Sequence, residues 1–514
     1  MTRALFPALL ALLSVSSLSA QDCVALKDAK IDRGAINSAE VVDSGSFRHP
    51  ITGAVYDHLP TFCRVRGELP PTADSDIRFE VWLPEKAWNG RYLGVGNGGF
   101  AGEIDYRALA GDVVNGFAAA ATDTGHFGDS EDASWAYQHP EKIADFGWRA
   151  IHLTAQTAKQ IVAAYYGKPA AHAYFDSCSD GGREALMEAQ RFPDDYDGIL
   201  AGAPANNWAA MLGGGLVGLQ QTNLDPAAII PDLKLPAIER ASLAACDQLD
   251  GVKDGIVSDP EKCQFDPSSL LCKHGDSLDC LTAPQLASLR HIYAGGATPD
   301  GHVIFPGFLP GDEDGWHPWL VGSGPLGSSG AQYVRNYFRY MVENDPKFNI
   351  LAAPIETSLA DARAKTSRDL DSTNPDLRGF AARGGKLILY HGWNDPAISP
   401  WNTIRYYQSV QQTMGATESF LRLYMAPGVE HCVGGPGPDS FGQLGVPAEK
   451  NHGLFDVLQT WVESGTPPAE VIAAKYSHDQ KPLMTRPLCP YPQVAKYDGS
   501  GDTNLAASFS CSQP

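Results

Sequence analysis

Two short segments far apart in the chain each place a cysteine beside a residue that could take part in catalysis. Cys178 precedes Ser179 in one segment, and Cys432 follows His431 in the other. A disulfide requires Cα atoms within about 7 Å of each other, so a bond between these cysteines would also bring the serine and the histidine together. A serine nucleophile with a histidine base is the machinery of acyl transfer. The two segments therefore predict a serine hydrolase site tied by a disulfide.

The residues around Ser179 have the pattern of a nucleophile elbow, in which a strand, a tight turn and a helix expose the serine oxygen. A strand is predicted over 171–175 and a helix over 182–191. Gly181 allows the turn, but Ser177 stands where the usual motif has glycine. Ser177 is itself a second candidate nucleophile, although no glycine follows it at the same spacing. A surface turn that merely contains a serine remains the alternative.

Asp395 and His431 each follow a predicted strand, over 386–390 and 420–425. The resulting chain order of serine, aspartate and histidine is that of the α/β-hydrolases. Taken alone, Asp395 is better explained as a turn residue before proline, and most of the 14 histidines should be structural. The order of the three residues and the neighbouring Cys432 favour a catalytic triad of Ser179, Asp395 and His431.

A glycine-rich loop, Gly96-Asn97-Gly98-Gly99, follows the predicted strands of residues 77–96. An oxyanion hole needs one amide from the residue after the nucleophile and one from an early loop of this kind. The candidates are the N–H groups of Asp180, Gly98 and Gly99. A plain turn is the alternative for the glycines.

A second constellation consists of aspartates spaced by three and four residues among glycines. Calcium takes carboxylate and carbonyl oxygens in a flexible shell, so this loop is a candidate calcium site, although it is not an EF-hand. A solvated acidic loop closed by a Cys246–Cys263 disulfide is an equally good interpretation. The proposed ligands are Asp247, Asp250 and Asp254 through their carboxylates, and Val252 and Ile256 through their carbonyls.

The order of the predicted strands and helices that position these residues indicates an α/β fold. Strands alternate with helices up to about residue 204 and again from 379, with helices predicted over 146–166 and 455–463 and a strand over 198–202. This alternation is typical of an α/β-hydrolase sheet with helices on both faces. Residues 205–378 lack it and are predicted to form an inserted lid domain, which includes the aspartate loop. The catalytic domain is then formed by residues 21–204 and 379–514.

Composition limits the partners and the compartment. With 39 basic and 60 acidic residues the formal charge is −21, which disfavours nucleic acid and anionic membranes as partners. Residues 1–20 have the pattern of a secretory signal peptide, and no later apolar run could span a bilayer. A secreted or periplasmic location is expected. The absence of an Asn-x-Ser/Thr sequon favours a bacterial source over a fungal one.

Ten cysteines in an exported chain imply disulfides. Proximity in sequence suggests four pairs and leaves Cys178 and Cys432 to form the fifth, although many other connectivities are possible. The four pairs are Cys23–Cys63, Cys246–Cys263, Cys272–Cys280 and Cys489–Cys511.

Together these motifs resemble the tannase and feruloyl esterase family of α/β-hydrolases, which includes the hydrolase of mono(2-hydroxyethyl) terephthalate. The similarity rests on Cys-Ser-x-Gly-Gly-Arg at 178–183, the loop that carries Asp395, and the His-Cys pair at 431–432. Segments such as 123–126, 189–193 and 201–205 also match. It implies a triad of Ser179, His431 and Asp395 bridged by Cys178–Cys432. It also implies the same five disulfides, and a structural Ca²⁺ ion in the lid on the five aspartate-loop residues named above, with no organic cofactor.

The resemblance further implies a secreted carboxylic ester hydrolase that acts on esters of aromatic acids, either small molecules or esters linked to plant polymers. We expect hydroxycinnamate (feruloyl) esters first, galloyl esters second and terephthalate monoesters third. An α/β-hydrolase fold that only binds its ligand is the alternative from another class. Six residues of the insertion could line an acyl pocket or belong to its core: Trp208, Trp316, Arg335, Tyr337, Phe338 and Arg339.

Overall fold

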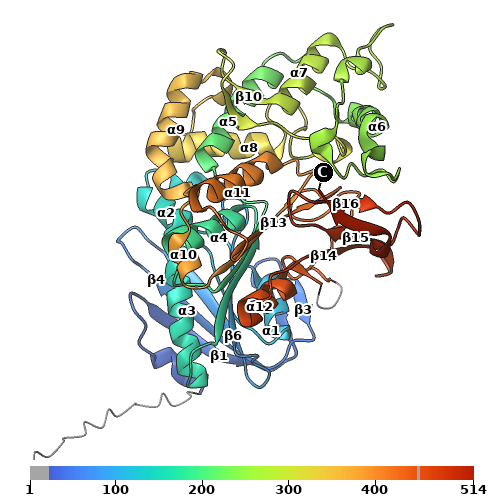
Figure 1. The fold of residues 1–514 in the computed structure, drawn as a ribbon. Coiled ribbons are helices and arrows are strands. Elements are labelled where there is room, and N and C mark those ends of the chain that lie inside the picture. Colours follow the sequence, from blue (N-terminus) through green and yellow to red (C-terminus); the bar gives the residue numbers. More distant parts are fainter. Residues whose placement is uncertain (1–21, 449–451, 514) are drawn as a thin grey trace, which may run out of the picture.

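The fold is built on a nine-stranded mixed sheet (Figure 1). The computed structural model describes residues 22–448 and 452–513, so the predicted signal peptide lies outside the described residues. The strand order is β1-β4-β5-β7-β6-β8-β9-β12-β13. Pairs from β1 to β7 are antiparallel, and those from β7 to β13 are parallel. The strands are β1 (Ala35–Val42), β4 (Phe62–Leu69), β5 (Ile77–Pro84), β6 (Arg91–Val95), β7 (Ala118–Thr122), β8 (His172–Cys178), β9 (Gly198–Gly202), β12 (Lys386–Gly392) and β13 (Leu421–Ala426).

Helices cover both faces of the parallel part of the sheet, as the sequence predicts. Alternate residues of β12 show this: Leu387 and Leu389 pack in one core cluster, and Ile388 and Tyr390 pack in another. Burial on both faces explains why this strand reads as a continuous apolar run. The first cluster includes α3 (Ala150–Tyr166), α4 (Asp180–Arg191) and α11 (Pro400–Met414), and the second includes α12 (Leu454–Ser464). A further cluster places α1 (Tyr106–Val114) against the antiparallel strands.

Residues 205–378 contribute no strand to the nine-stranded sheet. Their helices gather at one end of the molecule (Figure 1), and we call this part the inserted segment. That the inserted segment forms a separate lid domain remains a prediction. Its elements are α5 (Trp208–Asn223), α6 (Leu235–Cys246), α7 (Ala283–Ala294), α8 (Ser329–Asn336), α9 (Ile355–Leu370) and the hairpin of β10 (Gly295–Ala297) and β11 (Val303–Pro306).

Three small hairpins and two short helices complete the fold. The remaining elements are β2 (Ser46–Arg48), β3 (Val55–Asp57), α2 (Pro140–Ala144), α10 (Arg378–Ala382), β14 (Val471–Tyr476), β15 (Pro482–Leu488), β16 (Val494–Tyr497) and β17 (Phe509–Ser512). Within the described ranges, no helix has both the length and the apolar character needed to cross a membrane.

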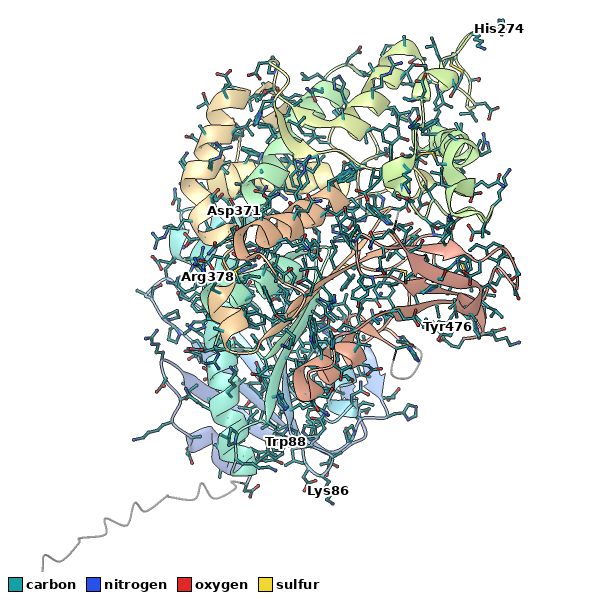
Figure 2. All side chains as sticks on the ribbon, viewed as in Figure 1. Lys86, Trp88, His274, Asp371, Arg378 and Tyr476 are labelled. Carbon is teal, nitrogen blue, oxygen red and sulfur yellow. A yellow bond between two sulfur atoms is a disulfide. The ribbon has the colours of Figure 1, made fainter. Side chains whose placement is uncertain are left out.

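Five disulfides tie the fold together, and they join the pairs that the sequence suggests. The molecule extends from Lys86 and Trp88 to His274 at the tip of the inserted segment (Figure 2). The bonds are Cys23–Cys63, Cys178–Cys432, Cys246–Cys263, Cys272–Cys280 and Cys489–Cys511.

Candidate active site

Ser179, His431 and Asp395 form one hydrogen-bonded line at the carboxyl ends of three neighbouring strands. His431 Nε2 lies 2.8 Å from Ser179 Oγ, and His431 Nδ1 lies 2.8 Å from Asp395 Oδ2. The serine follows β8, the aspartate follows β12 and the histidine follows β13. Because β8 and β12 flank β9, and β13 lies beside β12, their ends meet at one edge of the sheet. The structure thus brings together all three predicted triad residues.

Ser179 occupies a strained turn between β8 and α4. Its φ is +67° and its ψ is −122°, a combination that non-glycine residues rarely adopt and that aims the side chain away from the sheet. Gly181 is required here because a Cβ at that position would lie 1.8 Å from Ser177 Oγ. A Cβ at Gly96 would lie 2.7 Å from the same oxygen. The two glycines therefore leave the room that the unusual Ser177 needs.

Asp395 is completely buried, and four hydrogen-bond donors or ring nitrogens surround its carboxylate. Oδ1 accepts the N–H groups of Ala397 and Ile398, at 2.8 and 2.9 Å. Besides His431, the buried His391 places Nε2 3.1 Å from Oδ2. Burial alone would raise the pKa of Asp395, but the two histidines and their hydrogen bonds hold it well below its ordinary value. The carboxylate therefore stays charged and can orient His431.

The sequence did not single out His391, although it ends the strand that carries Asp395. Its Nε2 also lies 3.0 Å from the carbonyl of Ile398, and Nδ1 lies 2.7 Å from Thr403 Oγ1. An N–H at Nε2 satisfies both oxygen contacts, and Nδ1 then accepts from the threonine. His391 thus contacts the same carboxylate oxygen of Asp395, Oδ2, as His431 does. The sequence signal that could have revealed this contact is the position of His391, four residues before Asp395.

The disulfide between Cys178 and Cys432 links the two chain segments that carry the nucleophile and the histidine. The two Cα atoms are 6.0 Å apart, across 254 residues of sequence. Both cysteines directly neighbour a triad residue, so the bond fixes the separation of the two loops at the point where Ser179 and His431 meet. Cys432 itself has a φ of +67°, which shows that the histidine loop also turns sharply.

The glycine-rich loop lies beside Ser179, as expected for an oxyanion hole. Gly98, Gly99 and Asp180 line the same cavity as the serine. Asn97 anchors the loop to α4, because its carbonyl accepts the Gly181 N–H at 2.7 Å and its own N–H donates to Glu184 Oε2 at 2.9 Å. Glu184 is another residue that the sequence reading missed, since nothing local marks a contact that spans 87 positions.

A cavity of about 530 Å³ opens at the triad and extends into the inserted segment. Near His431 its wall is aromatic: the ring of Trp319 lies edge-on to the histidine at 5.2 Å and stacks on Tyr333. Of the six pocket candidates, only Trp208 lines this cavity. Trp316, Tyr337 and Phe338 belong instead to the core of the inserted segment, and Arg335 and Arg339 lie outside the lining. Trp319 and Tyr333 were missed because neither lies in a recognisable motif.

Comparisons with known proteins agree with this geometry. The family model described as tannase and feruloyl esterase matches residues 63–512. The chain belongs to this family. An "uncharacterized esterase" of Xanthomonas campestris pv. campestris is 40% identical over 98% of this chain and 92% of that protein. The mono(2-hydroxyethyl) terephthalate hydrolase of Piscinibacter sakaiensis is 33% identical over 96% of this chain and 92% of that enzyme. The crystal structure of feruloyl esterase B from Aspergillus oryzae matches with a TM-score of 0.88 at 29% identity, covering 95% of this chain and 99% of that one.

The resemblance found in the sequence is therefore confirmed, together with the α/β-hydrolase fold. As a tannase and feruloyl esterase family member, the chain is a carboxylic ester hydrolase. The bonded arrangement of Ser179, His431 and Asp395 is the chemistry that ester hydrolysis needs.

The aspartate loop has a donor set of the kind that Ca²⁺ takes. Asp247 and Asp250 are buried, Asp254 lies close to both, and Gly251 and Gly255 adopt positive φ values that let the loop turn tightly. Burial raises the pKa of Asp254, with Arg486 opposing that shift and the two other aspartates adding to it. Arg486 contacts Asp254 at 2.6 Å, so the three aspartates of the loop carry more negative charge than this one cation balances.

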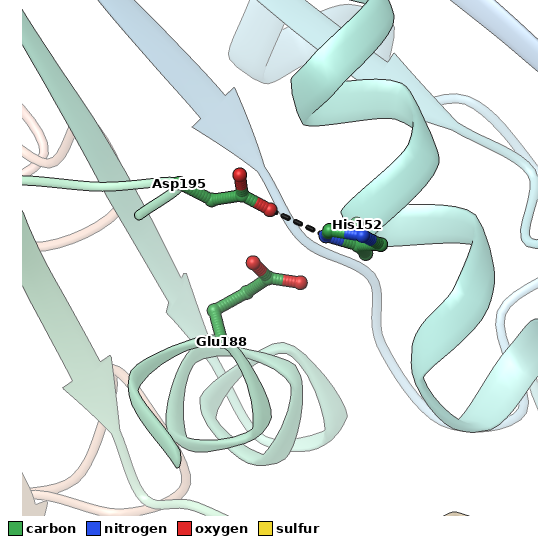
Figure 3. A group of neighbouring side chains, drawn as sticks. All are labelled: His152, Glu188 and Asp195. Atoms are coloured by element: carbon green, nitrogen blue, oxygen red, sulfur yellow. Dashed lines mark hydrogen bonds and ion pairs between the residues drawn. The ribbon is translucent and has the colours of Figure 1, made fainter. Parts of the chain in front are cut away.

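Another group has the residue types of a metal site. His152, Glu188 and Asp195 bring three ligand-type atoms within 4.8 Å of one another (Figure 3), the one such group that the described residues contain. His152 Nδ1 lies 2.6 Å from Asp195 Oδ2, and the amino group of Lys159 lies 3.7 Å from Asp195 Oδ1. Burial, followed by Asp195, raises the pKa of Glu188 well above its usual range. Asp195 already pairs with His152 and Lys159, and we assign no metal here.

Removing the disulfide next to the triad should impair catalysis more than removing one elsewhere. The Cys178→Ala/Cys432→Ala variant should lose about 100-fold in kcat for ester hydrolysis, because a displacement of about 1 Å at a reacting pair has that effect. The Cys489→Ala/Cys511→Ala variant is the matched control and should keep kcat within about threefold. Both should unfold more easily, so rates are compared at a temperature where circular dichroism shows both to be folded. Equal, small losses would show that the bond does not organise the site.

Proposed function

We propose that this esterase hydrolyses esters of hydroxycinnamic acids through an acyl-enzyme on Ser179. The observation that carries the proposal is the hydrogen-bonded line of Ser179, His431 and Asp395, which opens into a largely apolar cavity. A complete triad also argues against a fold that only binds its ligand, because such a protein has no need for a buried, charged aspartate behind a histidine.

The reaction follows from the positions of the side chains. Ser179 Oγ attacks the ester carbonyl while its proton moves to His431 Nε2, and the Asp395 carboxylate accepts the Nδ1–H bond and stabilises the imidazolium. The oxyanion would accept hydrogen bonds from the Asp180 N–H and from Gly98 or Gly99. His431 then gives its proton to the leaving alkoxide. A water molecule, deprotonated by the same histidine, cleaves the acyl-enzyme and restores Ser179.

The lining of the cavity favours a hydroxycinnamoyl group over the two other acids. No lysine or arginine occurs among the described residues that form its wall, so the free carboxylate of a terephthalate monoester would have no cationic partner there. The three hydroxyls of a galloyl group would need several polar partners, whereas the wall is mainly aliphatic and aromatic. One ring with few polar groups fits this surface best.

A side-by-side comparison of three esters tests the substrate. We expect kcat/KM to be highest for methyl ferulate, about tenfold or more above methyl gallate and mono(2-hydroxyethyl) terephthalate, since each unpaired polar group costs about 1–3 kcal/mol. A higher value for either competitor would refute the hydroxycinnamate assignment and leave the esterase mechanism standing.

We also propose that the aspartate loop holds one structural Ca²⁺ ion, with Asp247, Asp250 and Asp254 as carboxylate ligands and the carbonyls of Val252 and Ile256 completing the shell. Such an ion would hold the loop that follows α6 in place and would take no part in the chemistry.

Chelation should therefore lower the melting temperature, and metal analysis of the purified protein should find about one equivalent of calcium. Ca²⁺ at 100 times its Kd stabilises a fold by about 2.7 kcal/mol, so a shift of several degrees is expected. Asp250→Asn should remove both the calcium and the response to chelation, whereas Asp361→Asn, an exposed residue of α9, should keep both. A protein without calcium whose melting temperature ignores chelators would contradict the site.

Finally, we propose that the protein is exported, to the periplasm or the medium, with residues 1–20 as its signal peptide. Five disulfides support an oxidising compartment. An exported hydroxycinnamate esterase could act on small esters or on esters attached to plant polymers.

A further inference from the structure

The cavity at the triad continues along the whole length of α5. Trp208, Met211, Gly215, Leu219 and Thr222 of this helix line it at spacings of three and four and therefore form one face. At 1.5 Å per residue, this face runs for about 21 Å from Trp208 near the triad to Thr222. A hydroxycinnamoyl group is roughly 10 Å long at ordinary bond lengths. About half of the cavity thus lies beyond a single aromatic acid.

The wall of the cavity is mainly apolar. Leu219, Ile230, Ile292 and Val321 line it, as do His291 and Phe308, whose N–H donates to the Ile292 carbonyl. Gly218 faces open space, because a Cβ built there would meet no atom within 4 Å. A mainly apolar wall suits an alkyl chain better than a second phenolic ring.

The far end of the cavity turns polar. Ser288 is 2% exposed and lines the cavity, and its hydroxyl has no hydrogen-bond partner among the described residues. Thr222 and Asn223 line the same end. The apolar stretch is therefore bounded, and an alkyl chain should gain contacts only until it reaches these groups.

We propose that the distal half of this cavity is a subsite for an unbranched alkyl chain of the substrate. An acyl chain starts at Ser179, so at about 1.25 Å per carbon roughly its first eight carbons would occupy the proximal 10 Å, and roughly eight to ten more would fill the remaining 11 Å. The chain would therefore belong to the acid, as in a long-chain fatty acid ester. This inference rests on the proposed ester hydrolysis at Ser179.

A series of p-nitrophenyl esters from acetate to octadecanoate, all below their micelle concentrations, tests the subsite. We expect kcat/KM to continue rising beyond about eight carbons, by up to about threefold to fourfold for each methylene that enters the subsite. It should level off at about 16 to 18 carbons.

Gly218→Phe should abolish this rise and leave methyl ferulate within about twofold, whereas Gly218→Ala should keep it because a methyl group fits there. Gly111→Phe is the matched control: Gly111 is an exposed helical glycine of α1 with equally open space and lies outside the cavity lining. Melting temperatures show whether each variant is folded. If Gly218→Phe is not folded, the wild-type series alone decides whether the subsite exists.

Two results would overturn the subsite: rates that stay flat or fall beyond about eight carbons in the wild-type series, or a rise that persists in folded Gly218→Phe. In either case hydrolysis of methyl ferulate would leave the proposed function intact. Failure to hydrolyse methyl ferulate or any other ester would refute the proposed function itself.

Discussion

Replacing Ser179 by alanine should lower kcat for methyl ferulate by about 10⁴- to 10⁶-fold, the range seen when a triad nucleophile is removed. The serine oxygen is the atom that forms the acyl-enzyme, and its contact with His431 Nε2 is 2.8 Å. The fold should survive, because alanine differs from serine only by that oxygen. Steady-state kinetics and a melting curve measure both.

Ser177→Ala is the control for this variant, because Ser177 is the neighbouring serine that could have been the nucleophile. It packs against Gly96 and Gly181, and the hydroxyl that contacts His431 is that of Ser179. We expect it to retain most of the activity. If Ser177→Ala is inactive and Ser179→Ala is not, the nucleophile has been assigned to the wrong serine.

Asp395→Asn should lower kcat by about 10⁴-fold while the fold is retained. The asparagine side chain is nearly the same size, but it carries no charge and lets the imidazole adopt the wrong tautomer. The environment of Asp395, with two backbone N–H groups and His391 around it, is built for a carboxylate. A loss of less than tenfold in steady-state kcat would show that the aspartate does not orient His431. Asp361→Asn, on the surface of α9, serves as the control and should be unchanged.

The elements around the triad could be predicted because local patterns determine them. The strand predicted over 386–390 corresponds to β12, and the one predicted over 198–202 coincides with β9, since each is an apolar run ended by turn residues. The helix predicted over 146–166 is also present, although its first turn, Asp145–Arg149, is a π-helix. The antiparallel strands β1 and β4 went unpredicted because their pairing joins distant residues and because β1 shows little alternation of buried and exposed residues.

The site residues that could be predicted are those that stand beside a recognisable residue in the sequence. Cys178 and Cys432 mark the two triad loops because each cysteine directly adjoins the residue that it helps to position. The contact of Glu184 with Asn97 and that of Trp319 with His431 depend on how separate elements pack. Trp316 and Trp319 are only three residues apart, yet one lies in a core and the other in the cavity wall. No periodicity in that loop distinguishes them.

Labelling with a fluorophosphonate tests the central claim, that Ser179 is the activated nucleophile of this esterase, most directly. The reagent should add one phosphonyl group to the wild-type protein, peptide mass spectrometry should place it on Ser179, and ester hydrolysis should cease in step with labelling. Ser179→Ala should remain unlabelled. A single adduct on another residue, or full hydrolysis of methyl ferulate by a protein that the reagent does not label, would contradict the account.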